Sequence, residues 1–245
     1  MTISAIPWSG PALLWRVDLD AAPDPAALAA LSPAERQRAD RFVFPRDGAR
    51  FVAAHAALRQ LLAAQTGIPA ARLEFVEGDT GKPALTGPAG AEGSEVLHFN
   101  LSHSQGLALV AVSRGAEVGV DVELERAMPD AMELAGRCFS PQETADLRAA
   151  PPAARDRAFL VGWTRKEACI KALGLGLSVD LPKLHVGLET ALRHTHHATP
   201  EGRRALSVVS LFLGSGTVGA IAFAAPPSDN DEASASWSMP LETTE

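Results

Sequence analysis

Three carboxylates and a lysine in two short segments have the residue types of a magnesium site. Asp121 and Glu123 lie two positions apart in an apolar, strand-like segment, so both side chains point to one face of the strand. Glu167 and Lys171 lie four positions apart in a helical segment and share one helix face. The two segments together predict a site for a divalent cation if the strand and the helix converge.

Each segment also has a plain structural interpretation. Alternating acids on a strand commonly form a solvated face, and an exposed Glu-Lys pair on a helix contributes only a few tenths of a kcal/mol. Lys166 departs from this pattern, because it falls within the apolar stripe of the same helix, where an unpaired ammonium is costly. A helix that breaks the amphipathic rule in this way is typical of a functional site.

Composition places the chain among globular proteins. Its 245 residues, 47% of them hydrophobic, are enough for one large or two small domains. We expect neither a secretory leader nor a membrane span, and the two cysteines suit a reducing compartment, so the expected location is the cytoplasm. The net charge of -7 includes five acids and no Lys or Arg in residues 226–245. This segment is predicted to be a disordered acidic tail.

The remaining sequence repeats one plan. Ser32 and Ser140 each open the same helix-start signature, Ser-Pro-x-Glu, 108 residues apart. Strand-like and helical segments recur at similar offsets. We therefore predict an α+β fold: a pseudo-dimer of two similar α/β halves in one chain, residues 1–114 and 115–225, each a small antiparallel sheet packed on a long helix. Ligands are expected in the cleft between the halves.

Other polar residues have open interpretations. Arg38 and Arg50 belong to an arginine cluster that suits phosphate oxygens, or to a solvated helix face. Lys82 lies in a turn that can deliver an ammonium to a phosphate, or in a surface turn. His103, beside Ser102 in a strand-like segment, is either a phosphate ligand or a structural histidine. We expect the group of His194, His196 and His197 to lie in a solvent loop.

Three segments in order resemble a known family. They are Phe99-Asn100-Leu101-Ser102-His103-Ser104, then Val118-Gly119-Val120-Asp121-Val122-Glu123, then Trp163-Thr164-Arg165-Lys166-Glu167-Ala168-Cys169-Ile170-Lys171 followed by Gly174-Leu175-Gly176-Leu177. Their order and spacing are similar to those of the larger, surfactin-type class of 4'-phosphopantetheinyl transferases. The resemblance runs from the Ser32 helix to about residue 223, and this family's fold is a pseudo-dimer.

The resemblance implies transfer of the phosphopantetheine arm of coenzyme A to a serine of an apo acyl or peptidyl carrier protein, releasing adenosine 3',5'-bisphosphate. It implies that Mg²⁺ is held by Asp121, Glu123 and Glu167 and bridges the diphosphate. Glu167, directly or through a metal-bound water, would deprotonate the serine, and Lys171 would neutralise the diphosphate or the leaving group. The implied coenzyme contacts are Ser102, His103, Lys82, Arg38, Arg50 and Lys171.

The sequence departs from the family in the first half. Where surfactin-type enzymes have a lysine early in the first helix and a threonine after the Arg50 equivalent, this chain has Glu35 and Phe51. The carrier is expected to dock near residues 139–147, and the chain is expected to work as a monomer without nucleic-acid or membrane partners. Two alternatives remain: a non-catalytic module that binds carrier protein or nucleotide, and a metal-dependent hydrolase of diphosphate esters.

Overall fold

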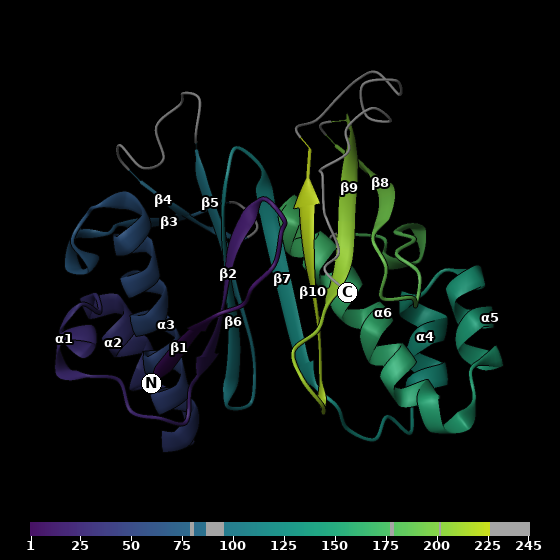
Figure 1. Ribbon diagram of the computed structural model, residues 1–245, viewed down its shortest axis with the longest axis horizontal. Coiled ribbons are helices and arrows are strands. Elements are labelled where there is room, and N and C mark those ends of the chain that lie inside the picture. The colour runs from purple at the N-terminus through teal and green to yellow at the C-terminus, as the bar shows by residue number, and fades with distance from the viewer. Residues whose placement is uncertain (79–80, 87–95, 177–178, 201, 226–245) are drawn as a thin grey trace.

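The computed structural model describes residues 1–78, 81–86, 96–176, 179–200 and 202–225. The predicted acidic tail, residues 226–245, lies outside the described residues, as do Asp79, Thr80 and Leu177. Two four-stranded sheets lie at the centre of the molecule, and helices cover the outer side of each (Figure 1). Among the described helices, none has both the length and the apolar character that a membrane span requires.

The first sheet has the strand order β1-β2-β6-β5, and its neighbouring strands are antiparallel. Its strands are β1 (Thr2–Ala5), β2 (Ala12–Asp18), β5 (Leu97–Ser104) and β6 (Leu107–Arg114). The helices beside it are α1 (Pro25–Ala29), α2 (Pro33–Ala39) and α3 (Pro45–Thr66). A separate two-stranded sheet joins β3 (Phe75–Glu77) to β4 (Pro83–Leu85).

The second sheet has the strand order β7-β10-β9-β8 and is also antiparallel. Its strands are β7 (Glu117–Leu124), β8 (Arg193–Thr199), β9 (Gly202–Leu211) and β10 (Thr217–Ala224). Its helices are α4 (Ala131–Cys138), α5 (Pro141–Ala149) and α6 (Pro152–Leu173). In each half, the strand that precedes the helices pairs with the last strand, and the last strand pairs with the one before it, which gives the series β2-β6-β5 and β7-β10-β9. The predicted α+β pseudo-dimer is therefore confirmed.

The long helices α3 and α6 have the same length and the same end signals. Each begins with a proline, whose missing N–H costs nothing at the first helical position, and each contains 22 residues. Gly67 and Gly174 end them in the left-handed conformation, with φ of 71° and 67°. The sequence therefore sets where both helices stop.

The two halves pack sheet against sheet. In β6, Ala108, Val110 and Val112 face α3, whereas Leu107, Leu109 and Ala111 face the other half. The central strand β10 divides in the same way between α6 and the interface. Burial on both faces explains why these strands are continuous apolar runs rather than alternating ones.

The prediction of a solvent loop for the histidine group is wrong. His194, His196 and His197 lie in β8, which pairs with β9. His197 is only 8% exposed, and Nδ1 of His194 lies 2.8 Å from the hydroxyl of Ser207. Larger and smaller exposure alternate along β8, which is an edge strand of the second sheet. Pairing with β9 makes this polar segment a strand although its composition favours a loop.

Candidate active site

Strand β7 and helix α6 approach each other closely at Gly119. A Cβ atom on this residue would lie 2.2 Å from the carbonyl oxygen of Ala168 and 2.3 Å from the amide nitrogen of Ala172. Only glycine leaves room for the helix backbone here. Because side chains alternate along a strand, Asp121 and Glu123 face the same way as Gly119 and come beside α6.

The centre of the site is a set of three hydrogen-bonded side chains from three elements. Lys171 of α6 donates to Oδ1 of Asp121 at 2.6 Å and to the hydroxyl of Ser102 on β5 at 3.0 Å. The Ser102 hydroxyl in turn donates to the same oxygen of Asp121 at 2.7 Å. The two halves of the chain therefore both contribute to the site.

Strand β5 reaches β7 through every second residue. The side-chain oxygen of Asn100 accepts a hydrogen bond from the amide of Val120 at 2.9 Å, and Ser104 donates to Oε2 of Glu123 at 2.9 Å. With Ser102 between them, these polar side chains occupy one face of the strand. The predicted strand position of this segment is confirmed, and its polar face joins the two sheets at their edges.

Glu167 lies near both acids of β7, although it comes from α6. Burial raises the pKa of its carboxyl group, and the negative charges of Asp121 and Glu123 raise it further against the opposing effect of Lys171. Burial also raises the pKa of Asp121, with Lys171 and Ser102 opposing. These carboxylates repel one another in a poorly solvated site, and a bound cation would offset that repulsion.

The donor set fits a hard divalent cation, but the three acids do not converge fully in this arrangement. Among the described residues, no three His, Cys, Asp or Glu side chains lie close enough to hold an ion together. Lys171 binds Oδ1 of Asp121, and Arg126 with Ser104 binds Oε2 of Glu123. Within the described part of the chain, the second oxygen of each carboxylate accepts no hydrogen bond. Oxygen donors are thus available to Mg²⁺.

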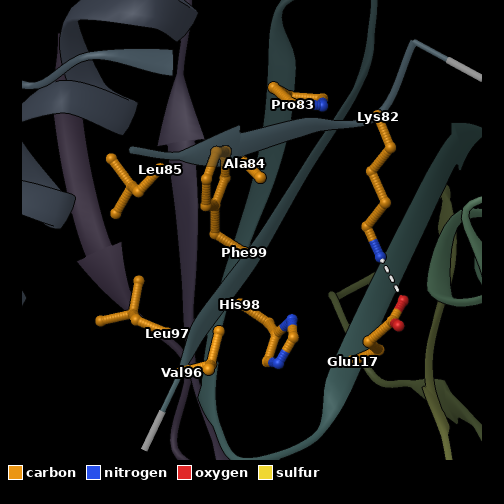
Figure 2. Close-up of a pocket in the computed structure, with 9 residues that line it drawn as sticks. All are labelled: Lys82, Pro83, Ala84, Leu85, Val96, Leu97, His98, Phe99 and Glu117. Carbon is orange, nitrogen blue, oxygen red and sulfur yellow. Dashed lines mark hydrogen bonds and ion pairs between the residues drawn. The ribbon is translucent and has the colours of Figure 1, made fainter. Parts of the chain in front are cut away.

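Lys82 lies between the halves rather than in open solvent. Its ammonium donates to Glu117 of β7 at 3.3 Å and to the carbonyl of Ala172 in α6 at 3.1 Å. Figure 2 shows the pair at one end of a pocket of about 260 Å³, with Leu85 and Leu97 at the other. This pocket is lined by β4, β5 and Glu117, so it is separate from the carboxylates of the candidate site.

The remaining predicted coenzyme ligands lie on the first half. Burial lowers the pKa of His103, and the positive charges of Lys171, His55 and Arg50 lower it further against the opposing charge of Asp121. Arg50 binds Asp20 through two hydrogen bonds of 2.7 and 3.1 Å, and the Arg38 guanidinium lies 5.3 Å from the centre of the Phe51 ring. His103 thus stands among cations, which favours an anionic ligand.

Sequence reasoning missed a buried pair behind α6. The ammonium of Lys166 is fully buried and binds Oε2 of Glu143 at 2.9 Å, which accounts for a lysine within an apolar stripe. The capping box at Ser140 predicts that Glu143 opens a helix, but it does not identify Lys166 as the partner of Glu143. In the segment expected to meet the carrier, residues 139–147, Phe139 and Leu147 are buried in the core, whereas Pro141, Gln142, Ala145 and Asp146 are exposed.

Comparison with known proteins agrees with this architecture. A family model described as the 4'-phosphopantetheinyl transferase superfamily matches residues 117–219, and one described as 4'-phosphopantetheinyl transferase, N-terminal, matches residues 24–115. The chain is 38% identical to the 4'-phosphopantetheinyl transferase HetI of Nostoc sp. over 86% of both proteins. It is 30% identical to the 4'-phosphopantetheinyl transferase Sfp of Bacillus subtilis, over 64% of this chain and 66% of that protein. The chain therefore belongs to the 4'-phosphopantetheinyl transferase family and is a transferase enzyme.

Proposed function

We propose that this chain transfers the 4'-phosphopantetheine group of coenzyme A to a serine of an apo acyl or peptidyl carrier protein. The observation that carries the proposal is the meeting of Ser102, Asp121 and Lys171 beside Glu123 and Glu167. This arrangement offers carboxylates, an ammonium and a hydroxyl at one place between the halves. Phosphoryl transfer needs little more than such positioning and charge neutralisation.

In the proposed reaction, the carrier serine oxygen attacks the phosphorus that bears the pantetheine arm. A new P–O bond forms, and the bond to the bridging oxygen breaks, so that adenosine 3',5'-bisphosphate leaves. Glu167 takes the serine proton. Its raised pKa suits this role, because a carboxylate with a higher pKa binds a proton more tightly. Lys171, which already binds Asp121 across the site, neutralises charge on the diphosphate or on the leaving group.

The proposed cofactor is Mg²⁺, held by Asp121, Glu123 and Glu167. When bound, the ion would neutralise the diphosphate and orient it for in-line attack. Support comes from the donor chemistry: Glu167 lies near enough to Asp121 and Glu123 to feel their charges, and the second oxygens of those two acids are hard ligands. Lys171 and Arg126 neutralise these carboxylates in the described arrangement.

The coenzyme phosphates are proposed to meet Ser102 and His103, with Lys171 beside them. The cations around His103 support this, because their field favours an anion. For Lys82 and Arg50 to contribute, their side chains must exchange the carboxylates of Glu117 and Asp20 for phosphate. Arg38 needs no such exchange with a carboxylate among the described residues. We propose that the chain acts as a monomer, since one chain contains both halves.

One assay separates this proposal from its two alternatives. Purified protein is mixed with coenzyme A, Mg²⁺ and several apo carrier proteins, and the mass of each carrier is followed together with release of the bisphosphate. A gain of one phosphopantetheine by a carrier supports transfer. Bisphosphate without carrier modification would indicate a hydrolase, and complex formation without either product would indicate a binding module.

A further inference from the structure

Two buried cations occupy the same position in the two long helices. Arg59 of α3 and Lys166 of α6 each lie fourteen residues after the first residue of a 22-residue helix. Arg59 is 2% exposed and Lys166 is fully buried. A charged side chain at such a position requires a complete set of partners, because an unpaired buried charge is severely destabilising.

Each cation binds the third residue of the preceding short helix. Lys166 pairs with Glu143 of α5 at 2.9 Å, and Arg59 pairs with Glu35 of α2 at 2.8 Å. Both acids belong to capping boxes, in which they also accept a hydrogen bond from the backbone of the capping serine. The two halves therefore contain one ion-pair arrangement in duplicate.

The cations also bind carbonyl groups of the segment that follows each helix. Lys166 donates to the carbonyls of Leu181 and Leu184, and Arg59 donates to those of Ala70 and Leu73 at 2.8 and 3.0 Å. In both halves one carbonyl belongs to the first residue of a short 3₁₀ turn (Ala70–Arg72 or Leu181–Lys183) and the other to the residue that follows the turn. The ammonium of Lys166 thus has an acceptor for each of its three protons.

The two ion-pair arrangements differ in the residues that follow the buried cation along the helix. Lys166 is followed by Glu167 and then by Lys171, whereas the corresponding positions of α3 are Gln60 and Ala64. Adjacent helical residues are fixed about 100° apart around the axis. A rotation of α6 that moves Lys166 away from its partners therefore also moves Glu167 relative to the acids of β7.

Glu143 is itself held rigidly. Besides Lys166, its carboxylate accepts hydrogen bonds from the amides of Ser140, Val186 and Gly187 at 2.7 to 2.9 Å. Burial would raise the pKa of Glu143, but Lys166 and the amides of Ser140 and Val186 hold it below its ordinary value. An anion fixed by the backbone gives Lys166 a definite position.

We propose that the Glu143–Lys166 ion pair is a positioning device that sets the rotation of α6 and thereby places Glu167 and Lys171 against Asp121. This inference rests on the proposed function. Neither Glu143 nor Lys166 touches the reacting groups. The duplicate pair Glu35–Arg59 has the same chemistry on a helix that carries neither Glu167 nor Lys171, so it supplies a matched structural control.

The test compares Glu143→Gln and Lys166→Met with Glu35→Gln and Arg59→Met at a temperature where melting curves show all four variants folded. We expect the second-half variants to lower kcat at least tenfold and to change the KM for coenzyme A less than twofold. The first-half variants should keep kcat within twofold of the wild type for a comparable loss of Tm. Equal losses of kcat in both halves, or an unchanged kcat after Lys166→Met, would overturn the inference.

A second arm does not depend on turnover. Crystal structures of the wild type and of the double variant Glu143→Gln with Lys166→Met are compared for the distance between the carboxyl groups of Glu167 and Asp121. We expect a displacement of Glu167, and an unchanged distance would refute positioning. A wild-type chain that modifies no carrier would instead refute the proposed function, while this structural comparison would still decide the role of the pair.

Discussion

Asp121 and Glu123 are each held through one oxygen. Both partners of Asp121, Lys171 and Ser102, bind Oδ1, and both partners of Glu123 bind Oε2. Each carboxylate is therefore oriented by the protein and can still present its second oxygen to a ligand. A site built in this way combines a fixed geometry with open coordination, which is what cation binding and catalysis both need.

The first prediction concerns the acids themselves. Asp121→Ala and Glu167→Gln should each lower kcat for carrier modification by about 10²–10⁴-fold, because one removes a proposed metal ligand and the other removes the proposed base. Circular dichroism should show an intact fold. Glu133→Gln, which affects only an exposed pair with Arg137, is the control and should retain full activity. Activity retained after either active-site substitution would refute the assignment.

A second prediction concerns Glu35, which joins the capping box of α2 to Arg59 of α3. Burial raises its pKa, but hydrogen bonds from His55 and Ser32 and the charge of Arg59 outweigh burial and lower it from 4.5 to about 2. A carboxyl group whose pKa is lower in the folded state stabilises the fold above its unfolded pKa. That contribution disappears as the pH falls through the folded pKa.

Stability should therefore decline between pH 4.5 and 2, by about 2 kcal/mol from this group after allowance for its solvent-exposed part. Urea unfolding at several pH values measures the effect. In Glu35→Gln the decline over this range should be smaller by that amount. If the variant and the wild type lose stability in parallel, Glu35 does not carry this pH dependence.

At the scale of elements, the contact of β7 with α6 decides whether a site exists. Gly119→Ala places a methyl group within 2.3 Å of two backbone atoms of α6, so strand and helix must separate. We expect a loss of about 3 kcal/mol or more in the free energy of unfolding, together with a large loss of activity. Thermal unfolding and the carrier assay measure the two effects.

The matched control is Gly136→Ala in α4. A Cβ atom on Gly136 meets nothing within 4 Å, and the residue is helical. Alanine should therefore stabilise the protein by about 0.5–1 kcal/mol and leave activity unchanged. Equal behaviour of the two variants would show that close approach at Gly119 is not what the site requires.

Local signals predicted the elements better than they predicted the partners of single side chains. The capping boxes predicted where α2 and α5 begin, and the apolar runs of β6 and β10 predicted buried strands, because each signal depends only on residues within one element. The bonds of Lys82, Lys166 and Lys171 join residues far apart in the chain. No spacing within one element encodes them, so the sequence marked Lys166 as unusual without identifying Glu143.

At the scale of the molecule, the two halves depend on one another. Their inner sheet faces form one apolar cluster, in which Leu14 and Leu109 of the first half meet Val120, Ile221 and Phe223 of the second. Polar links also join the halves, among them those at the candidate site, where Ser102 binds Asp121 and Lys171. The interface therefore contributes stability through apolar burial, and the proposed site depends on it because the second half contains the three acids whereas Ser102 and His103 belong to the first.

This dependence gives a final prediction for a chain divided between Arg114 and Gly115, in the turn that joins β6 to β7. Gly115 has a φ of 78° and lies outside both strands, so the cut itself breaks neither sheet. Each fragment produced alone should aggregate, because a whole sheet face becomes exposed to water. Fragments produced together should associate in a one-to-one complex and regain carrier modification, as measured by size-exclusion chromatography and carrier mass. A second-half fragment that is monomeric and active alone would contradict this, since it would place every essential group after residue 114.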